Sequence, residues 1–205
     1  MQAFFRDKNV TLVGGVPSGW RTLSGDSRSD DGFAWSDVYA AFEVVHPWLV
    51  GRFKDDAGAD KTLRNVILPD AKLCRDRGQD YLPVVWPGFS WSNMGQGTFN
   101  EIPRRGGKFL QRQLRNVLAV ANVDMLYGAM FDEVDEGTAM YKIAATKKEL
   151  PTQGQFIYAG IDGDDVPGDT WLRLLGEAAN TLHNSGDDNN AELSGASRTK
   201  YLGIW

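Results

Sequence analysis

Four carboxylates within five positions carry the most evident chemistry of the sequence: Asp132, Glu133, Asp135 and Glu136. They follow directly on residues 125–131, an uncharged and partly aromatic run of about a strand's length. Like charges this close repel one another, so the cluster costs stability unless binding or catalysis uses it. Glu133 and Glu136 become neighbours if the chain turns at Asp132, whereas a continuing strand would point them to opposite faces. The pattern predicts a turn that presents a carboxylate pair.

Paired carboxylates are the usual acid–base apparatus of glycoside hydrolysis. Glu133 and Glu136 are the candidate catalytic residues, and a turn would allow their carboxyl groups to reach the separation of about 5–5.5 Å that retention requires. The residues alone leave open which glutamate is the acid. The alternatives to a catalytic pair are an acidic loop that is only solvated and a site that binds a cation. A bound cation would keep both glutamates ionised, whereas a general acid must be protonated, so we predict no metal and no cofactor.

Five strand-like segments, alternating with helical ones, must position these acids. The strands are expected at residues 10–13, 46–53, 81–86, 125–131 and 156–160, with helical segments including residues 60–77 and 138–148. Such alternation predicts a parallel sheet, and acids at a strand's carboxyl end favour an α/β fold of the (β/α)₈ TIM-barrel type. A complete barrel has eight strands in about 250 residues. We therefore expect one partial domain over residues 1–205, holding the last five units and ending in a loose polar tail at 185–205.

Aromatic and polar residues near the strand ends are the candidates for holding substrate. Aromatic rings stack on the apolar faces of sugars, although they fill cores more often. The run from Trp86 through Phe89 and Trp91 to Asn93 is the best candidate platform. The full set of candidate substrate-binding residues is Trp20, Arg21, Trp48, Arg52, Trp86, Phe89, Trp91, Asn93, Asp132 and Asp162.

Composition restricts the partners. The 205 residues are 42% hydrophobic and 24% charged, and the net charge of −5 argues against a nucleic-acid partner. One cysteine and two histidines exclude an internal disulfide and disfavour a cysteine- or histidine-rich metal site. No apolar run reaches membrane-spanning length, so we expect no membrane partner. The first residues do not resemble a signal peptide, and a secreted or periplasmic location is expected only if the true N-terminus lies upstream.

Several motifs resemble those of glycoside hydrolase family 99 and family 71-like proteins. Residues 131–139 read FDEVDEGTA, where family 99 has Phe-Asn-Glu-Trp-x-Glu-Gly-Thr. Residues 14–21, 47–52 and 82–93 read GGVPSGWR, PWLVGR and LPVVWPGFSWSN, and the similarity extends from residue 10 to about residue 183. The chain departs from the family at Ser92, where the family has histidine.

This resemblance implies a barrel fold, glycosidase activity and distinct roles for the two glutamates. Glu136 would be the general acid, and Glu133 would be the carboxylate on the anomeric side, acting in family 99 as a base toward the sugar's 2-hydroxyl. The expected substrate is a polysaccharide or glycan.

Two other function classes stay open. The chain could bind carbohydrate without turnover, as an inactive barrel fragment. Less favoured is a glycosyltransferase, whose donor phosphates could contact only Arg104, Arg105 and Lys108; a solvated helix start is the simpler interpretation of that basic run. Because five strands cannot close such a barrel, we expect either a homo-oligomer or a missing N-terminal half to cover exposed edges at residues 10–13 and 156–160.

Overall fold

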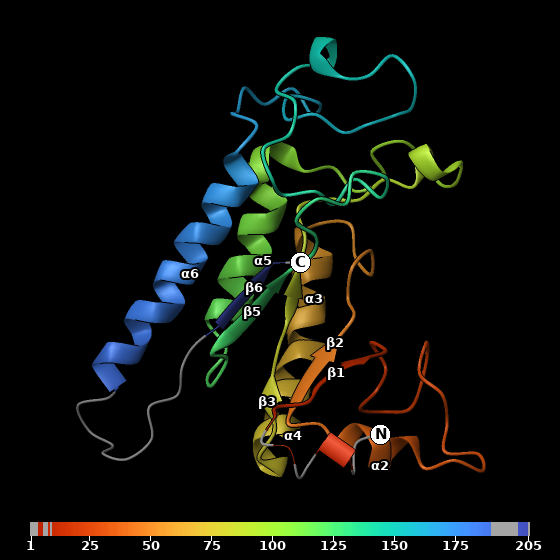
Figure 1. Ribbon diagram of the computed structural model, residues 1–205, viewed down its shortest axis with the longest axis vertical. Helices are drawn as coiled ribbons and strands as arrows, with labels where there is room; N and C mark the ends of the chain where they lie inside the picture. Colours follow the sequence, from red (N-terminus) through yellow and green to blue (C-terminus); the bar gives the residue numbers. More distant parts are fainter. Residues whose placement is uncertain (1–3, 6–7, 9, 190–200, 205) are drawn as a thin grey trace.

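Strands and helices alternate along the chain. The computed structural model describes residues 4–5, 8, 10–189 and 201–204 (Figure 1). No helix among these residues has the length and apolar character needed to cross a membrane. The principal elements are β1 (Val13–Val16), α2 (Trp35–Ala40), β2 (Val44–Pro47), α3 (Asp56–Thr62), the π-helical turn η1 (Leu63–Ile67), α4 (Leu68–Arg77), β3 (Asp80–Tyr81), β4 (Val84–Val85), α5 (Lys108–Leu118), β5 (Met125–Gly128), α6 (Thr170–Asn189) and β6 (Tyr201–Ile204). Three short 3₁₀ turns are η2 (Ser92–Met94), η3 (Arg105–Gly107) and η4 (Lys147–Glu149).

The strands form a parallel sheet in two sections, β1–β2–β3 and β4–β5–β6. One extended segment joins the sections. The Leu82 amide donates to the Val45 carbonyl at 2.9 Å, and the Pro83 carbonyl accepts from the Tyr127 amide at 2.9 Å. Proline has no N–H to donate, so the ladder is interrupted there. The described strands therefore make an open parallel array that is not closed into a barrel.

The two faces of the sheet are distinguished by register. Gly14, paired with Val45, shares a face with it, and Val13 shares the opposite face with Val44. We call the first the helix face, because α3 to α6 pack against it, and the second the open face. On the helix face of β5, the Leu175 side chain of α6 lies so close to Gly128 that an added Cβ would stand 3.0 Å from it.

The core lies between the helix face and the helices. Val45, Val85 and Leu126 are fully buried there. The Trp86 ring packs at 4.5 Å from that of Phe53 and 5.8 Å from that of Phe109, measured between ring centroids. The apolar stripe of α5 faces this core, and α5 and α6 lie side by side in Figure 1.

The helix predicted at residues 60–77 is present and begins earlier, at Asp56, where the Asp55 carboxylate caps it by accepting from the Gly58 amide at 2.7 Å. Pro69 cannot donate to the carbonyl of Asn65. A π-helical turn immediately precedes the proline, and the Arg21 guanidinium donates to the Asn65 carbonyl at 3.3 Å. The lost backbone hydrogen bond is thus replaced, and the helix continues past the proline.

The strands predicted at residues 10–13 and 46–53 are displaced, to Val13–Val16 and Val44–Pro47, and three other predicted segments differ more strongly. Residues 156–160 are not a strand: Ala159 and Gly160 donate to the carbonyls of residues 144 and 145, and the neighbouring edge of β5 is taken by β6. Residues 138–148 are irregular except where η4 begins, because their backbone groups bond to distant parts of the chain. The tail predicted over residues 185–205 begins inside α6 and includes β6; residues 190–200 lie outside the described part.

Candidate active site

The acid loop, residues 132–136, starts four positions after the end of β5. The backbone bends at residues 131–132 and turns over residues 134–137. The Gly137 amide donates to the Val134 carbonyl at 3.1 Å, and the Thr138 amide to the Glu133 carbonyl at 3.0 Å. Gly137 has φ +66°, a conformation that glycine adopts without strain. The predicted turn is confirmed, and it carries both Glu133 and Glu136.

The two glutamates have different surroundings. The Glu133 carboxylate accepts from the backbone amides of Asp135 at 3.0 Å and of Glu136 at 3.4 Å. The Glu136 carboxylate accepts no hydrogen bond from any residue that the structure describes. Both side chains are half-buried, whereas Asp132 and Asp135 are exposed. Distinct environments are what give two neighbouring carboxyl groups distinct roles in catalysis.

The loop after β4 supports the acid loop from one side. The Ser90 amide donates to the Glu136 carbonyl at 2.8 Å, and the Asn93 amide group donates to the Asp135 carboxylate. Ser92, where the resembled family has histidine, forms a 2.9 Å hydroxyl–hydroxyl hydrogen bond with Ser90. The loops that follow β4 and β5 therefore lie together, as predicted, and Asn93 contacts the acid loop through Asp135.

The aromatic platform is only partly available. Trp91 is 40% exposed and packs on the half-buried Phe89, with ring centroids 5.3 Å apart. Trp86 has no exposed surface, because its ring fills the core between Phe53 and Phe109. The prediction that Trp86 contacts substrate is therefore not supported, and Trp91 is the better-placed ring.

Trp20 and Arg21 both donate to the carboxylate of Asp70. The Trp20 indole N–H donates to Asp70 Oδ2 at 2.9 Å, and Arg21 Nε donates to Asp70 Oδ1 at 2.6 Å. Trp20 and Asp70 are both buried, and burial raises the pKa of Asp70 to about 6 despite its hydrogen bonds to Arg21 and Trp20. These residues tie the loop after β1 to α4, and these contacts give the predicted substrate role no support.

Two further predicted residues lie near the end of β2. Trp48 is 38% exposed, beside the rings of His46 and Tyr127 on the open side of the sheet. Arg52 forms an ion pair with Asp26 at 2.6 Å. Asp26 lies in the loop after β1 and also accepts from the backbone amides of Ser18 and Gly19 in that loop. Trp48 could contact a ligand, whereas Arg52 is engaged with a neighbouring loop.

Asp162 links two loops. Its carboxylate accepts from the Asn100 side chain at 2.7 Å and from the Arg105 backbone amide at 2.7 Å. Both partners belong to the connection between β4 and α5. Asp162 therefore holds this connection in place, and the predicted contact with substrate has no support in the geometry.

The basic run before α5 is engaged with the protein. The Arg105 guanidinium pairs with Asp56, and Lys108 pairs with Asp164 at 3.0 Å. Arg104 is only 2% exposed and donates to the carbonyls of Gly137 and Ala139, immediately after the acid loop. Burial lowers the pKa of Arg104 to about 9, and the nearby charge of Asp162 opposes this shift. Charge alone drew attention to this run in the sequence, and nothing there singles out Arg104.

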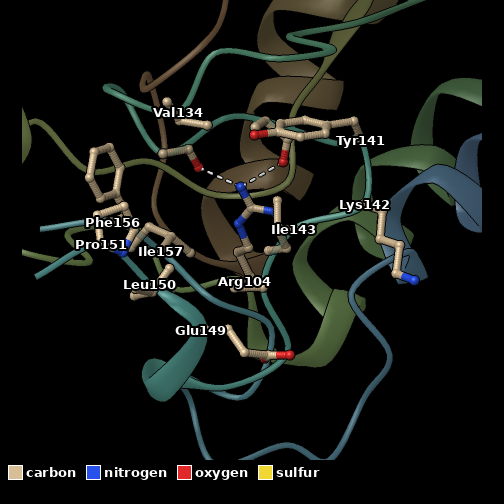
Figure 2. Close-up of a pocket in the computed structure, with 13 residues that line it drawn as sticks. Arg104, Val134, Tyr141, Lys142, Ile143, Glu149, Leu150, Pro151, Phe156 and Ile157 are labelled. Carbon is tan, nitrogen blue, oxygen red and sulfur yellow. Dashed lines mark hydrogen bonds between the residues drawn. The ribbon is translucent and has the colours of Figure 1, made fainter.

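A cavity of about 300 Å³ lies against the back of the acid loop (Figure 2). Val134 and Gly137 form one wall, and the remainder is largely apolar, with Ile143, Leu150 and Ile157 among the lining residues. None of the four acids lines it. In the described part of the chain, no three histidine, cysteine, aspartate or glutamate side chains are grouped so as to hold a metal ion.

Comparison with known proteins reveals a similarity of fold. No protein-family model and no curated protein matches the sequence. A solved structure of the GH99 endo-alpha-mannosidase from Bacteroides thetaiotaomicron, in complex with Bis-Tris propane, superposes with a TM-score of 0.53 and 11% identity. The likeness is one of fold. A second structure of a GH99 endo-alpha-mannosidase from this organism gives a TM-score of 0.48, also at 11% identity, over 75% of this chain and 40% of that one.

The first superposition covers 73% of this chain and 42% of the mannosidase chain. The chain thus spans less than half the length of this enzyme. The similarity supports the predicted relation to family 99 at the level of fold, and the predicted relation to family 71 stays a prediction. It agrees with a parallel α/β array related to part of a barrel.

Proposed function

We propose that the acid loop is the catalytic centre of a glycoside hydrolase that uses Glu133 and Glu136 as a carboxylate pair. The observation that carries the proposal is the position of the turn. It presents two half-buried glutamates at the carboxyl end of a parallel strand, in a fold similar to that of a glycosidase. Catalytic residues of (β/α)₈ enzymes occupy this end of their strands.

The surroundings of the two glutamates suggest their roles. Glu136, without a hydrogen-bond donor among the described residues, donates its proton to the departing glycosidic oxygen and then accepts a proton from the incoming water. Glu133, held by two backbone amides, is the carboxylate on the anomeric side. In the first displacement Glu133 takes the proton of the sugar's 2-hydroxyl, whose oxygen bonds to the anomeric carbon as the glycosidic bond breaks and Glu136 protonates the leaving oxygen. In the second, water that gives its proton to Glu136 attacks the anomeric carbon, the bond to the 2-oxygen breaks, and Glu133 returns the proton to that oxygen, so that the configuration is retained. The exposed ring of Trp91 is the proposed stacking surface for a sugar.

The proposal is tested by comparing the parent with Glu133→Gln and Glu136→Gln on aryl glycosides and manno- or xylo-oligosaccharides. Each substitution preserves shape and removes an ionisable carboxyl, so we expect kcat to fall by about 100-fold or more. Glu177→Gln, which alters an exposed carboxylate on α6, is the matched control and should retain parental activity. Parental activity in both loop variants would refute the assignment.

Carbohydrate binding without turnover is the second candidate. The open face supports it, because part of a barrel can retain a sugar-binding rim while lacking the rest of its pocket. Calorimetric binding of an oligosaccharide, with no release of reducing sugar by the parent, would favour this alternative. A glycosyltransferase is disfavoured, because Arg104, Arg105 and Lys108 are all engaged with protein groups.

A further inference from the structure

Arg104 joins the acid loop to the core. Its Nη2 donates to the carbonyl oxygens of Gly137 and Ala139, each at 2.8 Å (Figure 2). Its guanidinium carbon lies 4.6 Å from the centroid of the Trp171 ring, in the first turn of α6. Nη2 thus binds the carbonyls on either side of Thr138, while the guanidinium lies over the fully buried ring of Trp171.

The segment after β5 depends on such contacts. Residues 129–146 contain no helix or strand, and Thr138, Ala139 and Met140 are almost fully buried. Buried backbone carbonyls must be paired, and irregular segments need partners from elsewhere in the chain. Without Arg104, the carbonyls of Gly137 and Ala139 would lose this donor.

A guanidinium is a costly group to bury for this purpose. Nε and Nη1 of Arg104 have no hydrogen-bond partner among the described residues. Burying a cation that has no ion-pair partner among the described residues carries a large desolvation penalty, so global stability is a poor explanation for this arginine. A better explanation for the buried arginine is that it fixes the backbone conformation next to the acid loop.

We infer that Arg104 is a positioning residue that fixes Glu133 and Glu136 for catalysis; this inference rests on the proposed function of the acid loop. The Ser90 amide holds the Glu136 carbonyl at 2.8 Å, and Arg104 holds the next carbonyl along the chain. Consecutive peptide units are thereby fixed from two directions. This fixes the backbone from which the Glu136 side chain extends.

The kinetic test compares Arg104→Met and Arg104→Lys with the parent. Methionine fills the site without donors, and we expect a kcat lower by about 100-fold with a smaller change in KM, as misplacement of a catalytic group produces. Lysine retains one cationic donor group and should recover part of the loss. Arg105→Met removes the neighbouring guanidinium, which pairs with Asp56, and should retain parental kcat. Parental kcat in a folded Arg104→Met variant would overturn the inference.

A second measurement does not need catalytic activity. The Thr138 and Met140 amides donate to carbonyls within this segment, so Arg104→Met should accelerate their hydrogen exchange while core amides of α5 keep parental rates. Unchanged exchange at residues 138 and 140 would contradict positioning. If the parent lacks hydrolase activity but exchange changes as expected, the proposed function fails while the mechanical role of Arg104 stands.

If Arg104→Met does not fold, the parent itself decides the question. Nitrogen-15 spectra of a guanidinium held through two hydrogen bonds should show restricted rotation and slowly exchanging Nη2 protons at Arg104. A freely rotating, rapidly exchanging guanidinium would overturn the inference.

Discussion

The two faces of the parallel sheet differ in how completely this chain covers them. On the helix face, Val45, Val85 and Leu126 are fully buried. On the open face, Val13 is 54% exposed, and a Cβ added at Gly15 would meet nothing within 4 Å. The helices of this chain thus cover one face of the described sheet and leave part of the other exposed.

The two faces therefore have different roles: the helix face stabilises the fold, whereas the open face leaves surface exposed. The helix face supplies the burial that holds the strands in register. The acid loop stands at the carboxyl end of β5, at the rim shared by the two faces. Ser90 and Arg104 hold this loop through hydrogen bonds to the backbone carbonyls of Glu136 and Gly137.

The largest expected effect contrasts two tryptophans. Trp86→Ala should lower the free energy of unfolding by about 3–5 kcal/mol, because it leaves a cavity in the aromatic core. Trp48→Ala, on the open side, should cost about 1 kcal/mol, because its ring is already partly in solvent. Chemical denaturation measures both values. Equal losses would show that the open side is as well packed as the helix side.

A buried carboxylate on the helix side gives the second effect. Because burial raises the pKa of Asp70 to about 6 from its ordinary value of 3.8, the folded state binds more protons than the unfolded state between these pH values. The resulting stability is fully present below pH 3.8 and is lost as the pH rises through about 6. Relative to Asp70→Asn, the parent should lose about 2–3 kcal/mol between pH 3.5 and pH 7.

Denaturation curves at several pH values measure this difference. Asp76→Asn alters an exposed carboxylate of the same helix and is the control, which should not reproduce the loss. A difference between the parent and Asp70→Asn that does not change with pH would contradict the raised pKa.

The smallest effect on the free energy of unfolding is expected at β1, the strand at the edge of its sheet section. We propose that exposed β1 leads the chain to associate with a second copy, because unpaired strand edges recruit other strands. Val13→Lys should change the free energy of unfolding by only about 0.5 kcal/mol, since the side chain is exposed. It should nevertheless convert a dimer into a monomer in sedimentation experiments. A parent that is monomeric at all concentrations tested would contradict the proposal.

The parts of the fold that local pattern determines could be predicted from the sequence. Alternating strands and helices predict the parallel arrangement, and the abrupt change from an uncharged run to clustered acids predicts the turn near Asp132. The strand predicted at residues 156–160 was wrong. The apolar run there resembles a strand, but its backbone pairs with residues 144 and 145, a choice that depends on distant partners. The strand β6, beyond a polar stretch, carried too weak a signal in the sequence.

The site was predictable only in part for a similar reason. The acids, Trp91 and Asn93 gather at neighbouring strand ends, which follows from the parallel arrangement. The burial of Trp20 and Trp86 depends on Asp70 and on the aromatic core, which lie far away in the sequence. In the sequence Arg104 is one cation of a basic run, and the sequence does not show which of these cations becomes buried.

The stereochemistry of hydrolysis tests the central claim most directly. Proton NMR can identify the anomer released first by the parent from an oligosaccharide, before mutarotation mixes the products. A pair of carboxylates acting at close range predicts that this anomer retains the configuration of the cleaved bond. Release of the opposite anomer, or no hydrolysis by a folded parent, would contradict the proposed roles of Glu133 and Glu136.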